Sequence, residues 1–184
     1  MAQFFAVITD KHREFIARQK LYFVATAAPE GRINLSPKGQ DTFRVLGPNR
    51  VVWLNLTGSG NETAAHLRIA ERMTVMFCSF DADPLIVRLF GTARAIHPRD
   101  PEWDALIGCF PNSLGARQII DMQVTQAQSA CGFAVPQYEF KGERDLLTDW
   151  AKQKGETGVR AYWDTNNRIS IDGLQTGIME GEDS

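Results

Sequence analysis

Cysteine is scarce in this chain and never forms a motif. The three cysteines, Cys78, Cys109 and Cys131, lie far apart, and no Cys-x-x-Cys occurs. A disulfide framework or a zinc site needs paired or closely spaced cysteines, so the sequence supports neither. We therefore expect no bound metal and a reducing, cytoplasmic setting.

The chain also lacks a strong excess of either charge. Its formal net charge is −2, with 43% hydrophobic and 23% charged residues. A protein that binds nucleic acid or a membrane surface needs a dense basic patch, so we expect neither partner.

Long apolar runs are missing as well. No run approaches the roughly 20 residues that span a membrane. The first residues, from Met1 to Val7, carry neither a basic leader nor a long apolar stretch, so we expect no secretory signal. The length of 184 residues fits a single domain, 1–184, with room for a sizeable core.

What the chain does contain is a series of short strand-like segments. About six or seven of them follow one another through short turns, with one helix inserted before the strand that starts near Met73. This order favours an antiparallel barrel over a doubly wound sheet, in which strands and helices would alternate throughout. The predicted strands are 21–26, 32–36, 43–46, 51–56, 73–80, 85–96 and 122–134, and helices are predicted at about 10–19, 61–71 and 143–154, with a further one starting near 100.

Three local signals refine this prediction. Ile33 and Leu35 share one face of the strand 32–36, and polar residues occupy the other face. Pro37 cannot donate to a strand ladder, so the chain must bend or lie at a sheet edge there. Gly91, within the long strand, indicates a bulge or a close backbone approach.

A glycine-rich turn joins a strand to a helix and carries the first indication of function. The strand 51–56 is followed by Thr57-Gly58-Ser59-Gly60-Asn61-Glu62-Thr63 and then by a helical pattern. Such a junction presents free backbone N–H groups and the positive end of a helix dipole, which suits a phosphate. A second interpretation stays open: Ser59 and Glu62 match a capping box, which needs no ligand.

Taken in order, these segments resemble the pyridoxamine-phosphate-oxidase-like flavin-binding split-barrel family. The resemblance covers about residues 10–136 and includes the opening helix, the hairpin with Ser36-Pro37-Lys38-Gly39, the strand–turn–helix at 51–70 and the strand with Arg88-Leu89-Phe90-Gly91. Residues 137–184 form a helical C-terminal extension in this interpretation and resemble an uncharacterised subgroup of the family.

The resemblance implies a mainly β fold with appended helices, built on a six-stranded antiparallel split β-barrel. It also implies a homodimer with one FMN in each of two clefts at the subunit interface. In the family, a basic residue from an early strand and side chains at the start of the inserted helix hold the FMN phosphate.

The implied cofactor contacts fall on matching positions of this chain. One departure concerns the helix start, where the family oxidase has Ser-Arg-Lys and this chain has Asn61-Glu62-Thr63. Two cations are thereby lost, and Arg68 or Arg88 is expected to supply the missing charge. The full set of expected FMN contacts is Ser36, Lys38, Gly39, Asn61, Thr63, Arg68, Arg88, Gln128 and Ser129.

The function implied is that of an FMN-dependent oxidoreductase acting on an unidentified small molecule. Because flavin carries the redox chemistry, the absence of an evident acid–base pair is no obstacle. The oxidase's closing Arg-Leu-x-Pro-type segment is missing, so oxidation of pyridoxamine phosphate is not expected. The alternatives are a non-catalytic flavin-binding or flavin-sensing dimer, a binder of deazaflavin or haem in the same cleft (with His66 or Cys78 as a haem ligand), and a structural protein without a ligand.

Overall fold

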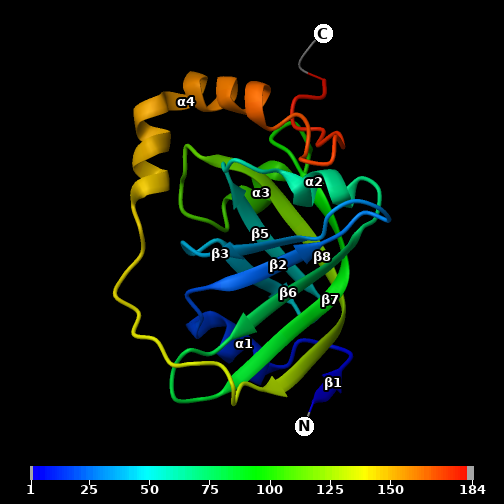
Figure 1. Cartoon of the computed structure of the whole chain (residues 1–184), viewed down its shortest axis with the longest axis vertical. Coiled ribbons are helices and arrows are strands. Elements are labelled where there is room, and N and C mark those ends of the chain that lie inside the picture. Colours follow the sequence, from blue (N-terminus) through cyan, green and yellow to red (C-terminus); the bar gives the residue numbers. More distant parts are fainter. Residues whose placement is uncertain (1, 182–184) are drawn as a thin grey trace.

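The computed structural model describes residues 2–181. Strands dominate, and the long helix α4 stands apart from them (Figure 1). The strands are β1 (Gln3–Phe5), β2 (Tyr22–Thr26), β3 (Asn34–Lys38), β4 (Phe43–Gly47), β5 (Arg50–Leu56), β6 (Arg72–Cys78), β7 (Leu85–Ile96) and β8 (Ala116–Cys131). The helices are α1 (Asp10–Arg18), α2 (Glu62–Leu67), α3 (Trp103–Ile107) and α4 (Leu146–Asn166).

All strands belong to one curled antiparallel sheet, in the order β3-β2-β6-β7-β8-β5-β4, with β1 also pairing with β8. The predicted class, a mainly antiparallel β fold with helices added, is confirmed. The pattern predicted six or seven strands and the resemblance implied a barrel of six, whereas the described sheet has eight. One added strand, β1, is only three residues long, too short to show the alternation by which strands are recognised.

The concave side of the sheet encloses the main core. Inward-facing side chains of five strands pack there with residues of α1, and each large apolar side chain buried in this way contributes about 1.5–3 kcal/mol. A smaller cluster packs α3 against the outer face of β5 and β8. Fully buried members of the main core include Val24, Trp53, Val75, Phe77, Val87, Leu89, Ile120 and Met122.

Two of the predicted backbone features are confirmed. Pro37 lies in β3, which pairs only with β2 and is therefore an edge of the sheet. The ladder between β7 and β8 shifts register between Phe90 and Gly91. A Cβ at Gly91 would collide with the backbone carbonyl of Gln123, so this close approach requires glycine.

The alternation in β3 is also confirmed, but its polar face is the inward one. Ile33, just before the strand, and Leu35 are 77% and 66% exposed, whereas Asn34 and Ser36 are half-buried. The edge of the sheet therefore presents apolar side chains to solvent and polar side chains to the interior of the barrel.

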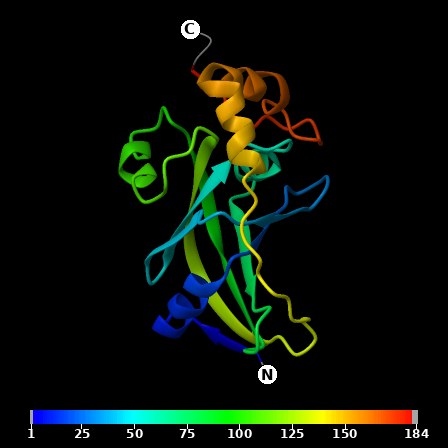
Figure 2. The ribbon, with the colours of Figure 1, turned by 90° about the vertical axis from the view of Figure 1, so that its left-hand side faces the viewer.

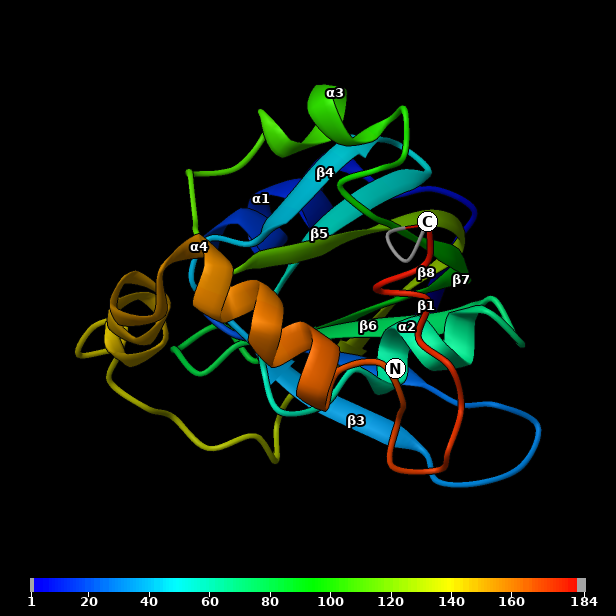
Figure 3. The ribbon, with the colours of Figure 1, turned by 90° about the horizontal axis from the view of Figure 1, so that it is seen from above.

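Helix α4 is reached through a long irregular segment, residues 132–145, which runs along the outside of the barrel (Figures 1 and 2). Gly155 interrupts α4 with φ 64° and ψ 174°. The prediction that Gly155 ends a helix is thus confirmed, but a second helical part follows it and runs in a different direction (Figure 3). Within residues 2–181, no helix has both the length and the apolar composition that crossing a membrane requires.

Gly91→Ala should lower the free energy of unfolding by about 1–3 kcal/mol, because the added methyl group must displace the backbone of β8. Gly47→Ala is the matched control, since a Cβ at Gly47 meets no atom within 4 Å. Urea unfolding followed by tryptophan fluorescence measures both variants. Equal midpoints for the two variants would contradict the close approach.

Candidate functional site

The glycine-rich turn keeps its position between β5 and α2, but it is not closed by the predicted capping box. Helix α2 has Asn61 as its N-cap residue, and no side chain makes a capping hydrogen bond there. The carboxylate of Glu62 instead lies over Gly60. The capping interpretation of Ser59 and Glu62 is therefore wrong, because distant partners, and not local ones, hold the turn.

Those partners come from the residue just before β8 and from the C-terminal segment. Both the backbone N–H and the hydroxyl of Thr57 donate to the carbonyl of Gly115, at 2.8 and 2.9 Å. The indole N–H of Trp163 donates to the Thr57 hydroxyl at 2.8 Å. The amide of Asn167 donates to the carbonyl of Gly58 at 3.1 Å. The end of α4 thus covers one side of the turn, while Ser59 at its tip remains exposed.

Two cations are associated with this turn: Arg117 contacts it directly, and Lys38 lies within electrostatic range of Glu62 and Arg117. Lys38, half-buried, places its ammonium 4.9 Å from the centre of the Trp53 ring. Arg117, at the start of β8, is 2% exposed, and its Nη1 donates to the carbonyl of Gly58 at 3.3 Å and to Oδ1 of Asn167 at 2.8 Å. Its Nε is buried without a partner. Within the part of the chain that the structure describes, neither cation forms an ion pair with a carboxylate.

The pKa values of both cations reflect this environment. Burial, reinforced by the charge of Arg117, lowers the pKa of Lys38 from 10.5 to about 8, and the nearby carboxylate of Glu62 opposes the shift. Burial lowers the pKa of Arg117 to about 10, again opposed by Glu62. Lys38, Arg117 and Glu62 therefore interact electrostatically and form one cluster. While Lys38 is protonated, this cluster carries one more positive charge than negative.

A chain of hydrogen bonds brings two of the predicted contacts together. The hydroxyl of Ser36 donates to Oδ1 of Asn34 at 2.9 Å, and Nδ2 of Asn34 donates to the hydroxyls of Thr63 and Thr26 at 3.0 and 3.2 Å. Thr26 in turn lies 3.1 Å from Nδ1 of His66. Asn34 thus links β3 to α2, although it was not among the candidate site residues predicted from the sequence. Its place on the polar face of β3, next to Ser36, is the signal that would have identified it as one.

The other predicted cations are engaged elsewhere. Arg68 forms an ion pair with Glu180 at 2.8 Å. Arg88 lies between Val87 and Leu89, which are fully buried in the barrel, so its side chain points to the outer face of the sheet. There it donates to Gln128 at 3.4 Å.

Gln128 and Ser129 lie near the far end of β8, where β1 pairs with it, and they face opposite sides of the sheet. Ser129 hydrogen-bonds to Nε2 of His12 in α1 at 2.9 Å. Lys38, in contrast, sits opposite Tyr22, a core residue, and faces the barrel interior. In the single chain, the inner group around Lys38 and the outer group of Arg88 and Gln128 are thus separated by the sheet.

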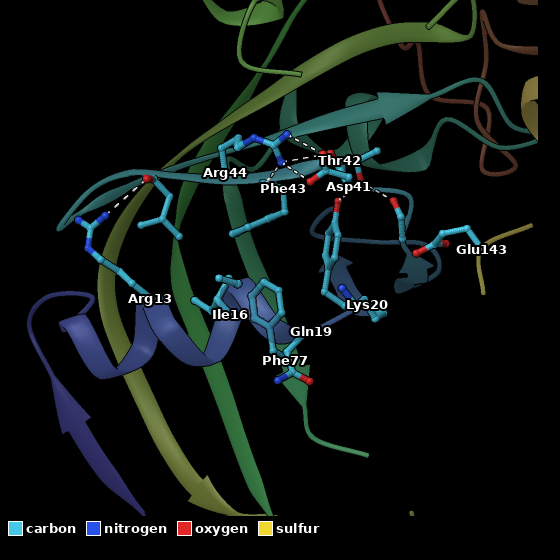
Figure 4. Close-up of a pocket in the computed structure, with 14 residues that line it drawn as sticks. Arg13, Ile16, Gln19, Lys20, Asp41, Thr42, Phe43, Arg44, Phe77 and Glu143 are labelled. Atoms are coloured by element: carbon cyan, nitrogen blue, oxygen red, sulfur yellow. Dashed lines mark hydrogen bonds and ion pairs between the residues drawn. The ribbon is translucent and has the colours of Figure 1, made fainter. Parts of the chain in front are cut away.

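Gly39, the remaining predicted contact, lines a separate cavity of about 480 Å³ at the end of the barrel beside α1 (Figure 4). Its floor consists of the rings of Tyr22, Phe43 and Phe77, whose centres lie 5.0–5.5 Å apart. The hydroxyl of Tyr22 bonds to Thr42 at 2.8 Å, and burial raises the pKa of Tyr22 well above its usual value. The cavity is large enough for a small organic molecule, and Arg13, Lys20, Asp41, Arg44 and Glu143 surround its rim.

Known proteins are similar to this chain in sequence and in fold. A family model described as pyridoxamine 5'-phosphate oxidase matches residues 8–131. The pyridoxamine 5'-phosphate oxidase family protein ustO of Aspergillus flavus is 43% identical over 141 residues, which are 74% of this chain and 57% of the relative. The chain therefore spans just over half the length of this curated relative.

Two solved structures are similar in fold. HupZ of Group A Streptococcus has a TM-score of 0.53 at 19% identity and covers 67% of this chain and 99% of its own. A candidate pyridoxamine 5'-phosphate oxidase of Lactobacillus delbrueckii has a TM-score of 0.54 at 15% identity, covering 67% and 94%. The fold is thus that of the split-barrel class. The chain belongs to the pyridoxamine 5'-phosphate oxidase family, as its sequence had indicated.

The pKa of Lys38 provides a direct test of the cluster. NMR titration of its labelled side chain in the ligand-free protein should give a value of about 8. Glu62→Gln should lower that value further, because the carboxylate stabilises the ammonium form.

Since the unfolded chain binds more protons than the folded one between pH 8 and 10.5, the free energy of unfolding should rise across this range. Lys38→Met should remove that part of the rise; parallel curves for the two proteins would contradict the assignment.

Proposed function

We propose that this protein binds FMN and holds the phosphate of the cofactor at the Thr57–Thr63 turn. The observation that carries the proposal is the pair of cations, Lys38 and Arg117, which within residues 2–181 have unused donors and form no ion pair with a carboxylate. Charge-assisted hydrogen bonds to a phosphate would use those donors. Membership of the family supports flavin as the bearer of that phosphate.

The hydrogen-bond donors around the turn fit the phosphate of FMN. Lys38 supplies a point charge, Arg117 a guanidinium with an unused Nε–H, and Ser59 an exposed hydroxyl at the tip of the turn. The network through Asn34 fixes the hydroxyls of Ser36 and Thr63 beside α2. The carboxylate of Glu62 is unfavourable near a phosphate. It offsets only part of the positive charge of the cluster.

We assign the protein to the FMN-dependent oxidoreductases that act on a small organic molecule. When bound, FMN supplies the hydride-transfer chemistry. The chain's own residues bind and orient the cofactor, and no protein acid or base is assigned. The free cysteines Cys78, Cys109 and Cys131 agree with a cytoplasmic setting.

The homodimer belongs to the same proposal. Because Lys38 faces the inside of the barrel and Arg88 and Gln128 face the outside, one flavin can contact both groups only if a second copy supplies the outer one. The exposed Ile33 and Leu35 at the edge of the sheet support such an association, since exposed apolar edges favour contact with another chain.

Lys38→Gln should weaken FMN binding about 10- to 100-fold, the loss expected for one charge-assisted hydrogen bond. Quenching of flavin fluorescence during titration measures the affinity. Lys152→Gln, the same substitution on the exposed surface of α4, is the control and should leave the affinity unchanged. Wild-type protein that is colourless and does not quench FMN would refute the proposal.

Reduction of the bound flavin then separates an oxidoreductase from a protein that only binds or senses flavin. We expect NADH, NADPH or another reductant to bleach the flavin absorbance anaerobically, and an acceptor to restore it. A flavin that no donor reduces productively would favour the non-catalytic alternative.

Sedimentation velocity tests the dimer. The wild-type protein should sediment as a dimer, and Leu35→Glu should shift it toward the monomer by placing a charge on the exposed edge. Leu114→Glu, which changes another exposed leucine, is the control. A monomeric wild-type protein that nevertheless binds FMN would contradict the shared site.

A further inference from the structure

At the start of α2, this chain lacks two cations that the family oxidase has there. The question is which residue supplies positive charge in their place. Asn61, Glu62 and Thr63 bring no positive charge to the turn. Arg68 is held by Glu180, and Arg88 points to the outer face of the sheet. Neither can reach the turn from the same subunit without breaking these arrangements.

Arg117 meets the requirements that the other two arginines fail. Its Nη1 already contacts the turn through the carbonyl of Gly58, and its Nε is buried with no acceptor among the described residues. An arginine that is 2% exposed and has no carboxylate partner is costly to bury, because desolvation of the charge is not compensated. The arrangement fits a guanidinium that is completed by an anion.

The position of Arg117 depends on the C-terminal segment. Oδ1 of Asn167, just after α4, accepts from Arg117 at 2.8 Å, and Nδ2 of the same side chain donates to Gly58 at 3.1 Å. The carbonyl of Asn167 accepts from Asn61 at 3.4 Å and from Thr176 at 2.5 Å. Asn167 is fully buried and therefore joins arginine, turn and C-terminal segment rigidly.

We propose that Arg117, positioned by Asn167, supplies the second positive charge for the flavin phosphate and sets the preference for FMN over riboflavin. This inference rests on the proposed FMN binding. Arg117 is the binding residue, and Asn167 is a positioning residue that acts through it. The C-terminal extension thereby contributes to a site whose other residues lie within the family-matched segment.

The ratio of the affinities for FMN and riboflavin tests this directly, because the two ligands differ only in the phosphate. Arg117→Gln should lower the FMN affinity about 10- to 100-fold and leave the riboflavin affinity nearly unchanged. Arg117→Lys, which keeps the charge, should recover part of the ratio. Asn167→Ala should reduce the ratio by a smaller factor.

Arg68→Gln is the matched control, since it removes an arginine that lies outside the turn cluster, and it should leave the ratio unchanged. Equal losses of FMN and riboflavin affinity in Arg117→Gln would show a structural role and overturn the inference. An unchanged ratio would also overturn it while leaving FMN binding intact. If Arg117→Gln does not fold, the ratio in Arg117→Lys and Asn167→Ala decides. Wild-type protein that binds neither ligand would instead refute the proposed function.

Discussion

Lys38 and Arg117 place two positive charges beside one turn, and burying such charges without a carboxylate partner costs several kcal/mol per ion before compensation. The two cations lie where β3, β5, β8 and the C-terminal segment meet, and their desolvation lowers the stability of the fold there. Glu62 reduces this cost only in part. The lowered pKa of Lys38 is a further sign of the same unfavourable environment. An anionic ligand would relieve the repulsion, and this is the reason for our proposal that the turn holds the phosphate of a flavin.

The C-terminal extension is part of this arrangement. The family model ends at residue 131, yet Trp163 and Asn167 hold the turn that the family-matched segment supplies. Gly155 allows this by breaking α4, so that its second half can run toward α2. A helix without that break would continue in the direction of its first half. The extension therefore shapes the site without belonging to the segment by which the family is recognised.

Local signals were sufficient for much of the fold. Pro37 indicated a sheet edge because it lacks an N–H, and Gly91 indicated a close backbone approach because only glycine leaves the room. The helix predicted at about 10–19 is α1, which Thr9 caps. The prediction of a capping box at Ser59 and Glu62 was wrong, because Thr57 anchors the turn instead, donating to the carbonyl of Gly115 and accepting from the indole of Trp163.

The sequence by itself determined the fold class, the family and the position of the turn, because periodicity, turn residues and the order of segments are local properties. It also pointed to Lys38, Ser36 and Thr63. Only the tertiary structure decided which cation joins Lys38. Arg117 and Asn167 lie more than 50 residues along the chain from Gly58, and their approach depends on the register of β8 and on the path of α4. Contacts of that range follow from the packing of the whole chain and leave no periodic trace in the sequence.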